Sequence, residues 1–270
     1  MPDNISQNLI AVYEFLKTNF FGYFYVAGDG LFIPGYFLWS AVLFIVFYVF
    51  LSSRLKSRKN ISNTPPTLNI KQTRREIIFS ITSSIIFGIT DLVIFVEIGK
   101  FFKVYNPTSG IGDTLWLIAS VPLLFIMHDT FFYWSHRAMH HPKIFRHVHK
   151  LHHLSKTTTP FTAISFHPIE AVIEGSWYVI PTIIFGFHPI AFLIFTLGQT
   201  FHTVFNHLGY EPFFKGFTKH PILGIKTTPT HYSMHHEKVG GNYVLYFTFW
   251  DRLMGTEFKD YHQRFEELTN

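Results

Sequence analysis

The sequence predicts an all-α integral membrane protein, a helical bundle of about four spans that carries a histidine-rich cap. Hydrophobic residues make up 48% of the 270 residues and aromatic residues 19%, whereas charged residues reach only 14%. A soluble domain carries roughly a quarter charged residues. Residues 31–51 contain no formal charge, over a length close to the roughly 20 residues that cross a bilayer. Eight of the 17 histidines fall between residues 128 and 153, and further sets follow later in the chain. We therefore place these clusters together in the cap.

Three apolar runs predict the first three spans. Residues 31–51 form the first, and residues 77–98 form the second despite two acidic residues, which we place toward its far end. Residues 115–127 reach only half the length of a span, but the apolar run continues through residues 125–134. The third span is therefore expected to end where the first histidines begin.

A fourth membrane segment is predicted over residues 164–205, where a long apolar stretch is interrupted. Pro181 and the sequence at residues 186–189 break it, because proline lacks the backbone donor that a helix needs. We therefore expect a hairpin, so that the fourth span is split or re-entrant. Residues 1–30 are expected to form an interfacial segment, and residues 1–270 a single membrane-embedded domain.

Basic residues predict which side of the membrane the histidines face. Residues 52–76 contain one acidic residue, Glu76, and seven basic ones, which are Arg54, Lys56, Arg58, Lys59, Lys71, Arg74 and Arg75. The next connection, residues 99–113, contains only Lys100, Lys103 and Asp113. Because cytoplasmic loops are the ones enriched in lysine and arginine, we place residues 52–76 in the cytoplasm. Counting the spans onward brings every histidine cluster to the cytoplasmic face.

Composition also excludes several kinds of chemistry. The sequence has no cysteine, which removes disulfides, zinc–thiolate sites and cysteine nucleophiles. The net charge of +5 suits a protein that lies against anionic lipid. Nucleic-acid binding needs a basic stripe on a folded surface, and the sequence shows none.

Three sets of histidines repeat one helical spacing. The sets are His136 with His140; His149 with His152 and His153; and His231 with His235 and His236. Side chains three or four residues apart lie on one face of a helix, so each set is expected to converge. His202 and His207 lie at the cytoplasmic end of the predicted hairpin, where they can join the same site.

These histidines predict a metal site. Neutral imidazole is the commonest metal ligand in proteins and suits iron, zinc, copper and nickel. A single metal needs about four ligands, so ten histidines indicate two metals, each held by four or five nitrogens. The sequence contains neither the Glu-x-x-His motif of soluble di-iron bundles nor the His-Glu-x-x-His motif of zinc proteases.

With their flanking residues, the histidine sets resemble the histidine boxes of the fatty acid hydroxylase/sterol desaturase superfamily. The flanking motifs are Asp129-x3-Tyr133-Trp134-x-His136-Arg137, Asn206-His207-Leu-Gly209-Tyr210-Glu211, Gly241-Asn242-Tyr243 and Trp250-Asp251-Arg-Leu-Met-Gly255-Thr256. The terminal Trp-Asp motif separates this superfamily from the acyl desaturases that share histidine boxes with it. The resemblance covers residues 115–256, which we expect to be the catalytic region.

The resemblance implies a non-haem di-iron centre that uses O2 to hydroxylate or desaturate a C–H bond of a sterol, a fatty acyl chain or a related lipid. Zinc could replace the two iron ions in purified protein. The implied catalytic residues are His136, His140, His149, His152, His153, His231, His235 and His236, and the implied metal ligands are these eight with His202 and His207. The sequence has no Gly-rich dinucleotide loop, so electrons are expected from a separate ferredoxin or small cytochrome with its reductase.

Four charged residues are candidates for orienting the histidines, namely Asp129, Arg137, Glu170 and Asp251. The last box departs from the superfamily pattern, which often reads His-x2-His-His. Tyr232 occupies the first position of that spacing. We expect His231, one residue earlier, to supply the ligand instead.

Two other classes of function fit a histidine-rich membrane protein. A metal transporter or sensor should carry its ionisable ligands near the middle of the bilayer, whereas these histidines cluster at one face. A zinc-dependent lipid hydrolase needs the metal but no electrons. Metal content, measured together with reductant-dependent O2 uptake, separates both from an oxygenase.

Overall fold

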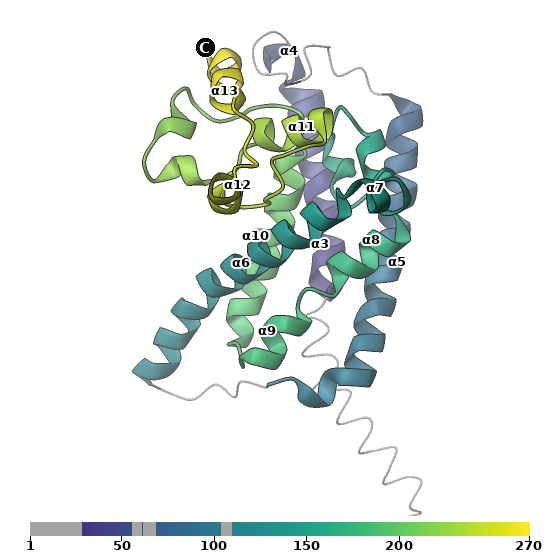
Figure 1. The fold of residues 1–270 in the computed structure, drawn as a ribbon, viewed down its shortest axis with the longest axis vertical. Helices are drawn as coiled ribbons and strands as arrows, with labels where there is room; N and C mark the ends of the chain where they lie inside the picture. The colour runs from purple at the N-terminus through teal and green to yellow at the C-terminus, as the bar shows by residue number, and fades with distance from the viewer. Residues whose placement is uncertain (1–28, 56–60, 62–68, 104–109) are drawn as a thin grey trace, which may run out of the picture.

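The computed structural model describes residues 29–55, 61, 69–103 and 110–270, which are helical and contain no β-strand. Four longer helices form the body of the molecule (Figure 1): α3 (Asp29–Phe44), α5 (Ile70–Ile98), α6 (Ile111–Met139) and α10 (Pro189–Asn206). The other helices are α4 (Ser52–Leu55), α7 (Pro142–Val148), α8 (Pro168–Gly175), α9 (Val179–Ile184), α11 (Pro229–Lys238), α12 (Phe249–Met254) and α13 (Tyr261–Thr269). Short 3-10 or π turns are η2 (Ile45–Phe50), η3 (Gly99–Phe101), η4 (His152–Leu154), η5 (Pro160–Thr162), η6 (Phe217–Lys219) and η7 (Leu223–Ile225). The expected all-α fold class is confirmed.

Three helical segments in the described part of the chain are long and apolar enough to cross a membrane. They cover Phe32–Phe50, Ile70–Phe101 and Ile111–Met139, and they correspond to the three spans expected from the apolar runs. The expected interfacial segment at residues 1–30, apart from its last two residues, lies outside the described residues, as do residues 56–60 and 62–68 of the basic connection.

The fourth apolar stretch is divided between α8, α9 and the shorter apolar helix α10, so it forms no single spanning helix. Breaks follow Gly175 and Ile184, and α10 begins at Pro189. Proline is favoured at a helix start, where its missing donor has no partner to lose. The chain therefore bends near the expected Gly-Phe-His-Pro sequence, whereas Pro181 lies inside α9.

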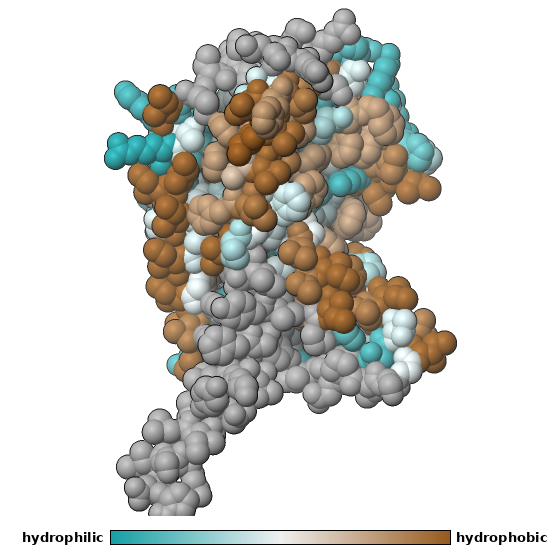
Figure 2. Space-filling model, turned by 180° about the vertical axis from the view of Figure 1, so that it is seen from behind, coloured by the Kyte–Doolittle hydropathy of each residue, from teal (hydrophilic) through white to brown (hydrophobic). Residues whose placement is uncertain are grey.

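The outer face of α5 presents a column of hydrophobic side chains to the surroundings (Figure 2). Beyond Ile70 at its start, the exposed apolar residues of this helix are Ile78, Ile81, Ile85, Ile89, Leu92, Val93 and Val96. A continuous apolar surface of this kind is costly in water and is typical of a helix that faces lipid. The exposed surface thus agrees with the membrane assignment made from the sequence.

A buried carboxylate ties the bundle to the histidine-bearing loop. Glu76 on α5 is fully buried, and its oxygens accept hydrogen bonds from Ser155 at 2.7 Å, Thr159 at 2.8 Å and Thr162 at 2.9 Å. These hydroxyls belong to the segment that directly follows His152 and His153. Because a buried carboxylate is stable only with such partners, this network fixes the position of that segment.

Candidate metal centre

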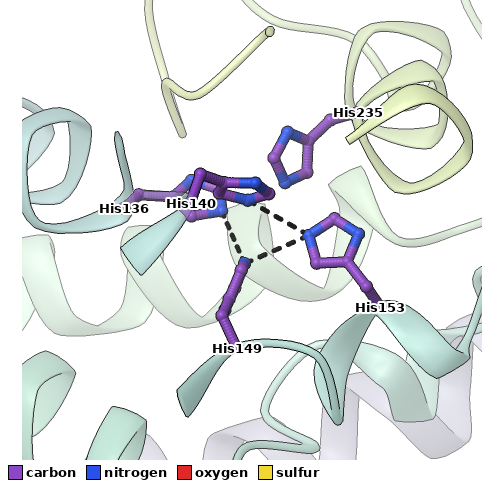
Figure 3. A group of neighbouring side chains, drawn as sticks. All are labelled: His136, His140, His149, His153 and His235. Atoms are coloured by element: carbon purple, nitrogen blue, oxygen red, sulfur yellow. Dashed lines mark hydrogen bonds between the residues drawn. The ribbon is translucent and has the colours of Figure 1, made fainter. Parts of the chain in front are cut away.

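Five histidines meet where the end of α6, the loop after α7 and helix α11 converge (Figure 3). They are His136, His140, His149, His153 and His235, and one nitrogen of each lies within 4.8 Å of the others. His136 lies in the last turn of α6 and His140 caps its end. We call this set the five-histidine group.

Three further histidines form a second set beside the first. His152, His207 and His236 also offer nitrogens within 4.8 Å of one another, and all three are buried. We call this set the three-histidine group. The two sets touch, because the rings of His153 and His236 are 4.8 Å apart between centroids.

The nitrogens of the five-histidine group lie close enough to share one ion. His149 Nε2 lies 3.0 Å from His136 Nε2 and 3.1 Å from His153 Nε2, which lies 3.2 Å from His140 Nε2. Metal–nitrogen bonds of about 2.1 Å set neighbouring ligands roughly 3.0–3.4 Å apart around one ion. The spacing of these nitrogens therefore fits a metal.

The proton positions of two rings strengthen this fit. His136 Nδ1 donates to the carbonyl of Tyr243 at 2.8 Å, and His149 Nδ1 donates to Glu170 Oε1 at 2.7 Å. In a neutral imidazole the other nitrogen then carries a lone pair. Burial raises the pKa of Glu170; with that carboxyl ionised, as a bound cation would favour, both Nε2 atoms carry lone pairs 3.0 Å apart, and a shared cation would remove their repulsion.

Main-chain carbonyls orient one further ring in each group. His235 Nδ1 donates to the carbonyl of Gly241 and His207 Nδ1 to that of Thr203, both at 2.8 Å. In both rings the buried Nε2 has no hydrogen-bond partner among the described residues. An oriented imidazole with a free nitrogen is the arrangement that metal ligands adopt.

Burial keeps these imidazoles neutral. It lowers the pKa of His235 to about 4 and that of His207 to about 3. Burial, reinforced by the neighbouring histidines, holds the pKa of His149, His152 and His236 well below the usual value. At neutral pH the lone pairs of these rings are therefore available to a metal without prior loss of a proton.

Two buried carboxylates position the segment that supplies the Tyr243 carbonyl. Asp251 accepts from the backbone amides of Tyr243 and Val244 at 3.0 and 3.2 Å. Asp129 accepts from the amides of Leu245 and Tyr246 at 3.1 and 2.8 Å. Both residues therefore act on the histidines through the backbone.

The other two charged candidates differ in their distance from the metal groups. Glu170 accepts directly from His149 at 2.7 Å. Arg137 instead donates to the Tyr133 hydroxyl at 2.9 Å and lies over the ring of Trp134. Of the four candidates, Glu170 alone bonds a clustered histidine through its side chain in the described residues.

The structure places His202 and His231 outside both groups. His202 Nε2 lies 3.2 Å from the carbonyl of Leu245, to which it can donate. His231 Nε2 lies 3.5 Å from Asp251 Oδ2. The remaining eight sequence-predicted ligands are those that the fold brings together. Tyr232 also lies nearby, with its ring 4.5 Å from that of His207.

The main-chain acceptors at Gly241 and Tyr243 are absent from the sequence-based prediction of the site. The Gly241-Asn242-Tyr243 motif was the available signal. A Cβ atom at Gly241 would lie 2.5 Å from the carbonyl oxygen of Thr256, so only glycine fits there. Asn242 adopts a φ of 56°, a left-handed conformation that asparagine tolerates better than most residues.

Fold and site together define a membrane protein with a buried polyhistidine centre. The model of the fatty acid hydroxylase family matches residues 121–256 of this chain. That match covers half of the chain and contains all ten predicted histidine ligands. The chain belongs to the fatty acid hydroxylase/sterol desaturase superfamily.

Individual relatives share about a third of the aligned residues with this chain. The lathosterol oxidase of Rattus norvegicus is 30% identical over 197 residues, which is 68% of this chain and 61% of that protein. The Delta(7)-sterol 5(6)-desaturase of Leptosphaeria maculans is 32% identical over 165 residues, which is 59% of this chain and 43% of that protein. The chain thus spans less than two thirds of the length of either relative. No solved structure matches it.

Proposed function

We propose that this protein is an oxidoreductase that uses two iron ions and O2 to hydroxylate or desaturate a C–H bond of a lipid. The observation that carries the proposal is the pair of adjacent histidine groups, eight imidazoles of which seven are buried. Iron bound by such imidazoles would supply the redox chemistry that dioxygen activation requires. Zinc suits the same nitrogens and is expected to replace iron in some preparations.

The residues around the groups suit an oxidising site. Glu170 and the carbonyls of Tyr243 and Gly241 hold three rings with Nε2 directed inward. Burial limits the access of water, which protects a reactive centre from side reactions. The chain has no cysteine, the side chain that such a centre would oxidise first.

A lipid substrate is supported by the apolar walls of the site and by the relatives. Phe132 and Phe166 place their rings 4.9 and 5.1 Å from those of His136 and His152. The relatives compared above are named a lathosterol oxidase and a Delta(7)-sterol 5(6)-desaturase. We therefore propose a sterol or a related lipid, with hydroxylation and desaturation as the two possible outcomes.

We also propose that the histidine groups face the cytoplasm and receive electrons from a separate ferredoxin or small cytochrome with its reductase. The basic residues 52–76 support this orientation through the positive-inside rule. Reporters fused after Lys59 and after Asn270 should both give cytoplasmic signals, whereas a reporter after Asn106 should not. A cytoplasmic signal at Asn106 would reverse the proposed orientation.

Metal content and O2 uptake test the oxygenase proposal directly. The protein is purified without added metal, its iron and zinc are quantified, and O2 uptake is followed with reduced ferredoxin and a sterol such as lathosterol. We expect iron and reductant-dependent uptake, and in His152→Ala the loss of uptake together with about half of the iron. Zinc alone with lipid ester hydrolysis would favour a hydrolase, and metal flux across vesicles would favour a transporter.

A further inference from the structure

A pocket lies beside the histidine groups, between helices α3, α5, α6, α8 and α10. It contains about 470 Å³ of space free of protein atoms, part of it open to the surroundings. Phe132, Phe166 and Tyr232 line it, and their rings lie 4.9, 5.1 and 4.5 Å from those of His136, His152 and His207. One end of the pocket therefore borders both groups.

Four polar side chains line the same pocket. His128, Glu174, Gln199 and Thr203 come from three different helices, α6, α8 and α10. Each is at most 9% exposed. Polar side chains buried among apolar helices are costly unless they are hydrogen-bonded, and in membrane segments they commonly mark functional sites.

Gln199 has an unmet hydrogen bond in this pocket. The side chain is 7% exposed, and its buried Oε1 has no hydrogen-bond partner among the described residues. By contrast, His128 Nδ1 is already within 2.7 Å of the Tyr246 hydroxyl, and Glu174 accepts from Ser135 at 3.3 Å. A buried acceptor without a partner is energetically costly, so a bound molecule that donates a hydrogen bond to it would be favoured.

The helix register sets the distance between this acceptor and the histidines. Gln199 precedes His207 by eight residues on and just beyond α10, and His128 precedes His136 by eight residues on α6. At 1.5 Å per residue, each pair is separated by about 12 Å along its helix. Two helices thus place a polar side chain and a clustered histidine at the same separation.

We propose that the pocket binds a lipid through a hydroxyl group that donates a hydrogen bond to Gln199 Oε1, with its hydrocarbon extending toward the histidine groups. This inference rests on the proposed function for the identity of the pocket as the substrate site. The separation of about 12 Å then sets the distance from the lipid hydroxyl to the carbon that lies beside the histidines. A hydrocarbon without the hydroxyl leaves Gln199 unpaired and should bind more weakly.

Binding of matched lipid pairs tests this proposal without requiring turnover. Purified full-length protein, with and without its metal, is loaded in detergent with tritiated cholesterol. Displacement is measured with cholestanol against cholestane, and with octadecanol against octadecane. We expect the alcohol of at least one pair to bind about tenfold more tightly than its hydrocarbon, and the pair that does so distinguishes a sterol from a chain alcohol.

Gln199→Met should remove that preference, because methionine has a similar length but no acceptor oxygen of comparable strength. Partition of each lipid into the micelle is the same for both proteins, so it cancels when the two preferences are compared. Thr200→Val is the matched control, because the Thr200 hydroxyl bonds the carbonyl of Thr196 on its own helix. The preference should survive in that control.

Equal preferences in the wild-type and Gln199→Met proteins would overturn the proposal, as would a wild-type protein without any preference. Should Gln199→Met fail to insert, Gln199→Asn withdraws the amide by one methylene and should reduce the preference severalfold; an unchanged preference there also overturns the proposal. A Gln199-dependent preference without reductant-dependent O2 uptake would leave this binding site in place and reject the oxygenase.

Discussion

The two histidine groups differ in how completely the protein surrounds them. In the five-histidine group, the Nδ1 atoms of three rings are hydrogen-bonded to Glu170, Tyr243 and Gly241. In the three-histidine group, the carbonyl of Thr203 orients His207 in the same way. Five nitrogens nearly complete the coordination of one ion, whereas three leave a position for a ligand from outside the protein.

The pocket makes this difference functionally relevant. All three rings in the smaller group contact pocket residues: His152 contacts Phe166, and both His207 and His236 contact Tyr232. In the larger group only two of the five rings do so among the described residues, His136 against Phe132 and His235 against Tyr232. The less saturated group therefore has the greater share of contact with the space that a lipid would occupy. This asymmetry leads to predictions about metal content.

Removing one ligand should have its largest effect in the three-histidine group. His152→Ala leaves two nitrogens, too few to hold an ion, so bound metal should fall from about two per chain to about one. His140→Ala leaves four nitrogens in the five-histidine group and should retain most of its metal. Elemental analysis of both purified variants measures the difference. Equal losses in the two variants would show that the groups do not differ in saturation.

Acid should destabilise the protein through both groups. Burial lowers the pKa of His235 to about 4 and of His207 to about 3, below the value of about 6.5 in an unfolded chain. As pH falls below 6.5, the unfolded chain binds protons that the folded protein does not. Each such histidine then lowers the unfolding free energy by up to about 1.4 kcal/mol per pH unit, until its folded pKa is reached.

Melting temperatures of metal-free protein between pH 7.5 and pH 4.5 measure this effect. In His235→Gln the melting temperature should fall less on acidification, because the variant lacks one buried imidazole with a lowered pKa. His220→Gln provides the control, since His220 is exposed. A melting temperature that does not fall on acidification would contradict the neutral state assigned to the buried rings.

Spacing predicted much of the site because helical periodicity is a local property. Seven of the eight clustered histidines belong to the sets with helical spacing, and the eighth, His207, was expected from its position at the end of the hairpin. His202 illustrates the limit of that reasoning, because it lies five residues before His207. Five residues turn a helix by about 140°, so the two rings cannot share a face. The spacing alone therefore indicates that His202 and His207 do not bind the same metal. Their common position at the end of the hairpin led us to predict both as ligands.

Other features of the site depend on contacts between distant segments. His231 and His235 have ideal helical spacing, yet Asp251, from the later helix α12, lies beside His231. The carbonyls of Gly241 and Tyr243 are backbone groups that every residue carries, so no side-chain pattern identifies them. The sequence likewise does not show that Glu76 would bind the loop after His153.

A smaller effect is expected from the acceptor behind His149. Glu170→Gln keeps the size of the side chain but replaces the carboxyl group by an amide that cannot ionise, which weakens the orientation and basicity of the ring. Affinity of the five-histidine group for its metal should fall by about 10–100-fold, with the three-histidine group retained. Glu174→Gln, one turn later on α8, is the control because Glu174 contacts Ser135 rather than a histidine. Competition with a chelator measures the metal affinity of each variant. An affinity in Glu170→Gln equal to that of the wild-type protein would show that Glu170 does not support the ring of His149.

The smallest effect on metal content is expected at His231. Its nearest charged neighbour is Asp251, and neither of its ring nitrogens belongs to the two groups. His231→Ala should therefore keep the metal, although the sequence predicts a ligand there. His236→Ala, on the same helix α11, leaves two nitrogens in the three-histidine group, so it should lose the metal of that group and serves as the matched comparison.

Stability rather than metal content should report the loss of His231. The side chain is fully buried, so His231→Ala leaves a void that costs about 1–3 kcal/mol and lowers the melting temperature by a few degrees. Asp251 keeps its bonds from Tyr243, Val244 and Thr256, which should preserve the Tyr243 carbonyl that orients His136. If His231→Ala lost metal while His236→Ala kept it, the third box would bind through the sequence-predicted residue, and the three-histidine group would have to be redrawn.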